Sequence, residues 1–353
     1  MMSCSRDRRY RTAMEALAAA LMVLAVVHLL AGTTSLSLST AVRAIITIGD
    51  MDPAARILWL LRLPRILVVV MAGAMLGLSG AIMQSVTRNV LAEPGLMGVT
   101  AGTVLAIVAV RAFWPTDLGA SVGWRPFIGM AGGFTAAALT YIASRRRGRL
   151  PNGSALILTG VLISTACGAL TTIILLGSLE AEAADILFWT LGSTNGRTWF
   201  HVEVLAPVAL IAATAGLVAT RVANALQLGE GVATGLGQHV GRARLALLFI
   251  ASVLTAGAVS VVGGVGFIGL MAPHIARSVS GGDARCLFPL STMTGATLLL
   301  GADLLARFAQ LGSLSSIAGL SLPGATGLPI GAVTALVGVP FFLYLAFRKG
   351  SGI

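Results

Sequence analysis

Residues able to do chemistry are few in this chain, and none is arranged for catalysis. The four histidines are scattered along the chain, and their spacing matches neither a metal site nor a hydrolase motif. They are His28, His201, His239 and His274. The cysteines also lack paired metal spacing, so we expect unpaired thiols at Cys4, Cys167 and Cys286. The sequence therefore predicts no catalytic residue, no metal site and no bound cofactor.

A phosphate-binding loop is missing as well. The G-x-x-x-x-G-K-[ST] motif needs a lysine that reaches the phosphates of the nucleotide. The sole lysine of this chain is Lys349, and it is followed by Gly350. We therefore expect any ATP that drives this protein to be bound by a separate subunit.

An ion-coupled carrier would keep ionisable groups near the middle of the membrane. Among the 13 Asp and Glu residues, only Asp303 lies well within an apolar segment. Arg307 follows it four residues later, which places both side chains on one face of a helix. The spacing predicts a structural ion pair rather than a proton relay. A secondary carrier remains an alternative that the sequence supports poorly.

The composition is that of a membrane protein. Of the 353 residues, 56% are hydrophobic and only 10% are charged, and the mean hydropathy is +0.92. Soluble domains carry about 25% charged residues. This composition excludes a cytosolic enzyme and a nucleic-acid binder, despite a formal net charge of +11.

We predict an all-α polytopic membrane protein, because each membrane-spanning helix needs about 20 apolar residues and the chain has room for about ten. No soluble domain is visible, so residues 1–353 are interpreted as one integral membrane domain with an N-terminal tail at 1–12. The eighth predicted span is too short to cross alone. The spans are expected near 13–32, 66–84, 96–112, 127–143, 155–178, 202–220, 245–262, 266–279, 287–308 and 331–347.

The arginines predict the orientation. If both termini are cytoplasmic, the larger share of the cations, including the cluster from Arg145 to Arg149, faces the cytoplasm, as loop charges usually do. A surplus of arginines is left on the outer side, close to the membrane edge. These outer arginines could form a docking surface.

Several sequence blocks resemble one family. Residues 62–65 read RLPR, and residues 80–99 read GAIMQSVTRNVLAEPGLMGV. Later blocks read LGE at 228–230, GFIGLMAPHIAR at 266–277 and LPIGAVTALVGVPFF at 328–342. In this order they closely resemble the FecCD-type permeases of iron-siderophore, haem and cobalamin importers, over about residues 40 to 348.

The resemblance implies a cobalamin-importer-like permease fold in a bacterial inner membrane. It implies four kinds of partner: a second permease copy or paralogue, two cytoplasmic ABC ATPase subunits, an extracytoplasmic solute-binding protein, and the cargo. We expect a ferric siderophore as cargo, carried into the cytoplasm. Haem and cobalamin remain alternatives, since no pathway residue distinguishes these solutes.

The resemblance also implies three sites. The binding protein is expected to dock on Arg62, Arg65 and Arg307. Anchoring of a span end in lipid headgroups would also explain the presence of Arg62 and Arg65. The loop 222–244 is expected to couple the permease to the ATPases. The residues that carry this expectation are Leu228, Gly229, Glu230, Gly235 and Gly237. A merely solvated loop is the alternative there.

The third implied site is the translocation pathway. A gate is expected at Asn152, Gly153 and Ser154, followed by a pathway wall at Gly160, Ser164 and Gly168. Small residues four apart, among them Gly73 and Gly77 in an earlier span, also let helices approach closely in a membrane, and helix packing alone would explain most of them.

The sequence departs from the family pattern near its last span. Family members commonly carry a Glu directly before the Leu-Pro-x-Gly of this span, whereas this chain has Gly327. The segment 308–327 is also longer than usual and rich in Gly and Ser.

Overall fold

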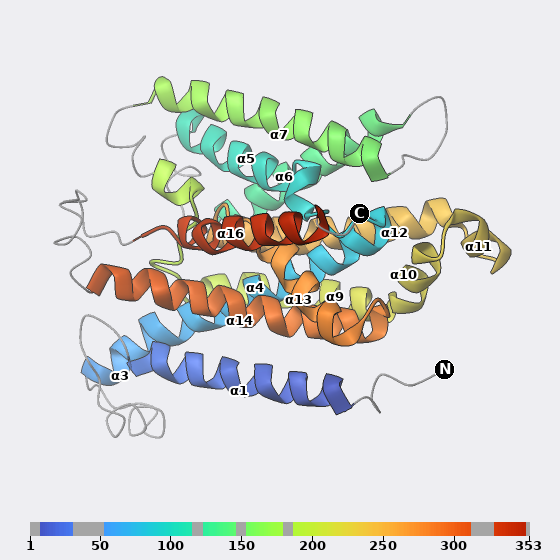
Figure 1. Cartoon of the computed structure of the whole chain (residues 1–353). Coiled ribbons are helices and arrows are strands. Elements are labelled where there is room, and N and C mark those ends of the chain that lie inside the picture. Colours follow the sequence, from blue (N-terminus) through green and yellow to red (C-terminus); the bar gives the residue numbers. More distant parts are fainter. Residues whose placement is uncertain are drawn as a thin grey trace.

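The protein is a bundle of helices that lie side by side (Figure 1). The computed structural model describes residues 8–30, 53–114, 123–145, 153–178, 186–311 and 328–350. Within these ranges, seven helices are long and apolar enough to cross a membrane, and two shorter apolar helices accompany them. All the regular structure in these ranges is helical, which confirms the predicted fold class.

Each of the ten predicted spans coincides with a helix. The eighth, α13, has only 13 residues, in agreement with the expectation that it cannot cross alone. The helices are α1 (Arg8–Leu30), α4 (Leu63–Thr87), α5 (Val99–Phe113), α6 (Arg125–Ser144), α7 (Gly153–Leu176), α9 (Trp199–Val218), α12 (Val240–Val262), α13 (Ile268–Ser280), α14 (Ala284–Leu311) and α16 (Ile330–Gly350).

Helix α4 is the central element of the bundle. It continues the short helix α3 (Pro53–Ile57) through a π-helical turn, η2 (Leu58–Arg62). Pro64 lies at the start of α4, where its missing N–H leaves the regular hydrogen-bond ladder incomplete, and a π-helical turn is one way to accommodate this. Within this helical run, the 33 residues Ala55–Thr87 form one candidate membrane span, and 78% of the most apolar window of that span is buried.

Glycines bring α4 into backbone contact with its neighbours. A Cβ atom added to Gly73 would lie 2.5 Å from the carbonyl oxygen of Gly295, and one added to Gly77 would lie 2.2 Å from that of Ser291. Both carbonyls belong to α14. A Cβ on Gly80 would meet the carbonyl of Gly269 in α13 at 1.8 Å. The predicted packing role of Gly73 and Gly77 is thereby explained, since only hydrogen fits between these backbones.

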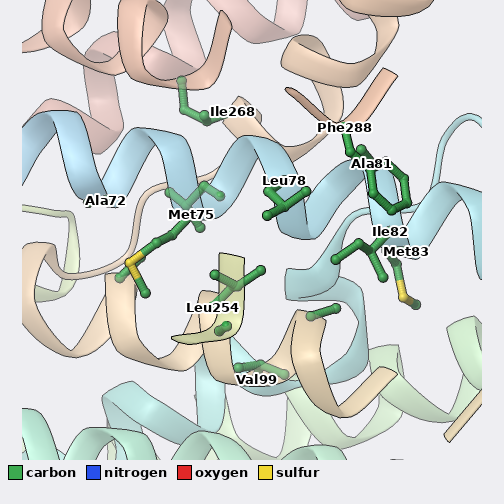
Figure 2. Close-up of a cluster of buried hydrophobic side chains, with 14 of the residues drawn as sticks. Ala72, Met75, Leu78, Ala81, Ile82, Met83, Val99, Leu254, Ile268 and Phe288 are labelled. Atoms are coloured by element: carbon green, nitrogen blue, oxygen red, sulfur yellow. The ribbon is translucent and has the colours of Figure 1, made fainter. Parts of the chain in front are cut away.

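The core surrounds α4. Figure 2 shows Met75, Leu78 and Ile82 of α4 beside Leu254 of α12, with Ile268 of α13 and Phe288 of α14 on its other sides. These side chains are almost completely buried. Helices α1 and α7 lie at opposite edges of the bundle (Figure 1) and bury little of their own surface.

The bundle has two ends, which we name by their residues. The Asp303 end holds the start of α4 and the last turns of α1 and α14. The α11 end holds the end of α4 together with two short helices, α10 (Thr220–Gln227) and α11 (Glu230–Gly235). Helix α1 begins and α16 ends toward the α11 end (Figure 1).

The thiols differ from expectation at one position. Cys286, near the start of α14, is disulfide-bonded, whereas Cys167 in α7 is free. The prediction of three unpaired thiols is therefore wrong for Cys286. Its sequence spacing gave no signal, because a disulfide depends on how distant segments are brought together in space.

Candidate docking and coupling sites

Asp303 is the centre of a buried polar network. Its carboxylate is shielded from solvent and lies 2.6 Å from Nε2 of His28 on α1. Arg65 of α4 donates to both of its oxygens, from Nε at 3.0 Å and from Nη2 at 2.8 Å. The hydroxyl of Thr194 donates to it as well. One carboxylate thus joins α1, α4, α14 and the segment that precedes α9.

The hydrogen bonds define the tautomer of His28. Nη1 of Arg307 lies 3.2 Å from Nδ1 of His28 and donates to the His28 carbonyl at 3.1 Å. A guanidinium can only donate, so Nδ1 must accept. The ring hydrogen is then on Nε2, from which it is donated to Asp303.

The partner of Asp303 differs from the prediction. The spacing predicted an ion pair between Asp303 and Arg307, whereas the carboxylate pairs with Arg65 and Arg307 reaches His28 instead. Helical periodicity identifies residues on the same face of one helix but says nothing about the neighbouring helices. The interpretation of Asp303 as a structural group fits this geometry, because every bond described to its carboxylate comes from a fixed donor.

The three arginines implicated in docking all lie at the Asp303 end. Arg62 is only 3% exposed, and its Nη1 donates to the carbonyls of Leu29 and Leu30, the latter at 3.2 Å. The Arg65 side chain is 18% exposed, and Arg307 is also partly exposed. Arg62 therefore caps the last turn of α1, while the side chains of Arg65 and Arg307 are accessible at the protein surface.

A small polar pocket opens between Arg65 and Arg307. Asp303 contributes to its wall, and Ser193, Thr194, Asn195, Ala306, Leu328 and Ile330 complete it. Nη1 of Arg65 donates to the Asn195 side-chain oxygen at 2.9 Å. The pocket therefore presents two guanidinium groups held by fixed partners.

Further arginines make the surroundings of this pocket strongly basic. Arg197 donates to the Ser193 carbonyl at 2.9 Å. Burial, together with the positive charges of Arg125 and Arg65, lowers the pKa of Arg197 to about 10. The clustered positive charges give the Asp303 end a positive electrostatic potential. This end therefore favours the approach of a negatively charged group.

Glu230 anchors α11 at the opposite end. Nη2 of Arg244, a buried residue of α12, lies 2.6 Å from a Glu230 carboxylate oxygen. Arg88 lies 3.9 Å from the same oxygen and ends α4 in a left-handed conformation with φ of 54°. The carboxylate thereby ties the short helix to the ends of α4 and α12.

The loop around Glu230 presents apolar side chains to its surroundings. Leu228 is 66% exposed and Leu236 is 63% exposed, with Val232 between them. Gly229 and Gly237 have φ of +113° and +79°, which strongly favour glycine. A Cβ on Gly235 would meet nothing within 4 Å. The loop is thus shaped by two glycines and carries an exposed apolar ridge, a feature typical of an interaction surface.

The residues expected along the translocation pathway differ in how closely they are packed and in how exposed they are. A Cβ on Gly160 would lie 1.9 Å from the Leu96 carbonyl, and one on Gly153 would lie 2.7 Å from that of Thr87. Both glycines therefore serve packing. Gly168 has nothing within 4 Å, Ser154 is exposed and Ser164 is partly exposed. Asn152 and Gly327 lie outside the described residues, as does most of the segment 308–327.

Glu93 is a candidate functional residue that the sequence analysis did not single out. It precedes the short helix η3 (Pro94–Met97) on the connection from α4 to α5, and its Cγ lies near Gly269, which packs on the backbone of α4. Burial raises the pKa of Glu93 to about 7, and a hydrogen bond from the Phe267 backbone opposes that shift. The connection folds back against α13, which no local pattern indicated.

No group suited to bind a metal accompanies these sites. Among the described residues, no three His, Cys, Asp or Glu side chains come together as ligands.

The fold and the two sites together define an integral membrane permease. The helical bundle has several membrane spans, with a basic pocket at one end and an exposed apolar loop at the other. The chain belongs to the FecCD transport family, which matches residues 20–348.

Known proteins agree with this assignment. The chain is 38% identical to the Fe(3+) dicitrate transport permease of Escherichia coli, with 82% of each chain covered. It is 36% identical to a cobalamin import permease of Halobacterium salinarum, covering 88% of this chain and 78% of that one. It is 34% identical to the hemin transport permease of Yersinia pestis, covering 93% and 94%.

A solved structure supports the fold. It is described as a metal-chelate type ABC transporter in an inward-facing conformation, and it matches with a TM-score of 0.77 and 28% identity over 94% of this chain and 98% of that one. The protein is thus a multi-pass cell-membrane permease of an ABC importer for iron chelates, haem or cobalamin. It is a transport subunit without catalytic activity of its own.

Proposed function

We propose that this permease imports a ferric siderophore. The observation that carries the proposal is the match to the FecCD family along residues 20–348, together with the 38% identity to an iron dicitrate permease. The basic Asp303 end supports it further, because many ferric chelates are anions. Haem and cobalamin are the competing cargoes, in view of the hemin and cobalamin permeases among the relatives.

In the proposed importer complex, the permease contacts three kinds of subunit, namely a second permease, the ATPases and a solute-binding protein. A second permease copy or paralogue would complete the pathway, for which the exposed face of α7 around Gly168 is available. Two ATPases would bind the loop 222–244, with the ridge of Leu228, Val232 and Leu236 seated in them. Closure of the ATPases on ATP would then move the two permeases relative to each other.

The outer side is assigned to the Asp303 end. A solute-binding protein would dock there through its acidic side chains, with Arg65 and Arg307 as the reachable partners and Arg62 behind them. The α11 end then faces the cytoplasm, as do both termini. This orientation agrees with the distribution of cations along the sequence.

One experiment identifies the partners and another the cargo. The wild-type permease, purified with its complex from native membranes, is analysed by mass spectrometry, and an ATPase and a solute-binding protein are expected. Uptake of radioactive iron by a deletion strain is then measured with ferric siderophores, haem and ferric citrate, and cobalamin uptake is measured beside them. Restoration by cobalamin or haem alone would overturn the iron-siderophore proposal.

A further inference from the structure

Asp303 holds Arg65 in one orientation. Two parallel hydrogen bonds, from Nε and from Nη2, fix the plane of the guanidinium against the carboxylate. A third bond, from Nη1 to Asn195, fixes the same group from another segment. These bonds use three of the five N–H donors that an arginine has, so donors remain for an incoming acceptor.

His28 extends this control to Arg307. The ring donates from Nε2 to Asp303 and accepts at Nδ1 from Arg307. The His28 carbonyl accepts from the same guanidinium nitrogen. The chain from Arg307 through His28 to Asp303 and Arg65 is therefore continuous, and both arginines line one pocket.

We propose that Asp303 and His28 are positioning residues that hold Arg65 and Arg307 ready to receive one acidic side chain of the docking solute-binding protein. The inference rests on the proposed function, because it needs docking at this end. It assigns the pocket between the two guanidinium groups to a single carboxylate. It also gives Asp303 a role in docking although the buried carboxylate does not touch the partner.

Asp303 affects docking in two opposite ways. Its negative charge reduces the attraction of the pocket for an acidic partner, so it slows the encounter. Its hydrogen bonds keep Arg65 from adopting other rotamers, so the bound partner leaves more slowly. Loss of the charge alone should therefore raise both the association rate and the dissociation rate, whereas general destabilisation of the permease would not speed association.

The test measures docking kinetics on the full-length permease in lipid nanodiscs, with the solute-binding protein that co-purifies with the wild type. Asp303→Asn should raise the association rate about threefold at low salt and the dissociation rate about tenfold. Arg307→Gln should slow association at low salt and speed dissociation. Arg285→Gln changes an exposed arginine near the start of α14, at the opposite end from Asp303, and should change neither rate.

His28 variants keep the test decisive if Asp303→Asn fails to fold. Gln can donate and accept as the neutral ring does, so His28→Gln should retain a dissociation rate within about threefold of the wild type. His28→Leu can do neither and should raise it about tenfold. Unchanged dissociation for both Asp303→Asn and His28→Leu would overturn the inference. Absence of any docking by the wild type would instead contradict the proposed function on which it rests.

Discussion

The buried Arg244 of α12 lies 2.6 Å from Glu230, the first residue of α11. Arg244 is 4% exposed, whereas about half of the Glu230 side chain is exposed. A buried cation thus holds a carboxylate at the surface, and Arg88 at the end of α4 stands 3.9 Å from the same oxygen. One carboxylate, that of Glu230, thus connects the short helix that we assign to ATPase coupling to two long helices.

Breaking this pair should weaken coupling between the subunits. We expect Arg244→Gln to leave cargo uptake by the reconstituted importer at least fivefold lower while the ATPases still hydrolyse ATP, because α11 would no longer transmit movement to α4 and α12. Uptake and hydrolysis are measured on the same proteoliposomes.

A matched control lies two residues away. Arg242 is exposed on the same helix, so Arg242→Gln removes an equal charge without touching Glu230. Equal losses of uptake for the two variants would show that net charge, and not the pair with Glu230, is what matters.

The seam between α4 and α14 predicts a sharp difference between two glycines. Gly77→Ala places a Cβ atom 2.2 Å from the Ser291 carbonyl, and overpacking of this kind costs about 1–3 kcal/mol. Gly168→Ala meets nothing within 4 Å and gains up to about 1 kcal/mol of helix propensity. Thermal unfolding in detergent should therefore show a lower Tm for the first variant and an unchanged or higher Tm for the second. A stable Gly77→Ala variant would mean that the two helices can separate at little cost.

The sequence allowed the helices to be placed because long apolar runs determine membrane spans. It also identified Gly73 and Gly77 as packing residues, since their spacing is local to one helix. The partners of Asp303 could not be predicted, because His28, Arg65 and Thr194 come from segments far apart in the chain. The resemblance likewise gave Arg62 as a docking residue, but only the tertiary contact with Leu29 and Leu30 reveals that its side chain is buried.

Glu93 predicts a pH dependence of stability. Its pKa is raised from 4.5 to about 7 in the folded protein, so the folded state binds more protons than the unfolded state between these values. Stability contributed by this group is therefore greatest below pH 4.5 and falls as the pH rises to about 7, by an amount on the order of 3 kcal/mol. Above pH 7 the contribution stays constant at its lower value.

Glu93→Gln should remove this dependence. The amide oxygen can still accept from the Phe267 backbone, and no charge remains to be desolvated. We expect a higher Tm than that of the wild type at pH 8 and a smaller difference at pH 5. Glu203→Gln, at an exposed position of α9, is the control and should leave the pH profile unchanged. A wild-type profile that rises between pH 5 and pH 7 and is unaltered by Glu93→Gln would contradict the desolvation of this carboxyl.

Arg62 should affect stability before it affects docking. Its guanidinium donates to the last carbonyls of α1, which otherwise lack helical partners, and a substituted residue would leave these partly buried acceptors without their charged donor. Arg62→Gln should therefore cost about 1–3 kcal/mol and lower the Tm. Arg307→Gln, by contrast, changes a partly exposed residue and should chiefly weaken association of the binding protein at low salt, where charge attraction is least screened. The two variants are compared by thermal unfolding and by docking at two salt concentrations. If Arg62→Gln unfolded like the wild type but lost docking in the same salt-dependent way as Arg307→Gln, Arg62 would have to turn outward to meet the partner, and its contact with α1 would be a feature of the undocked state alone.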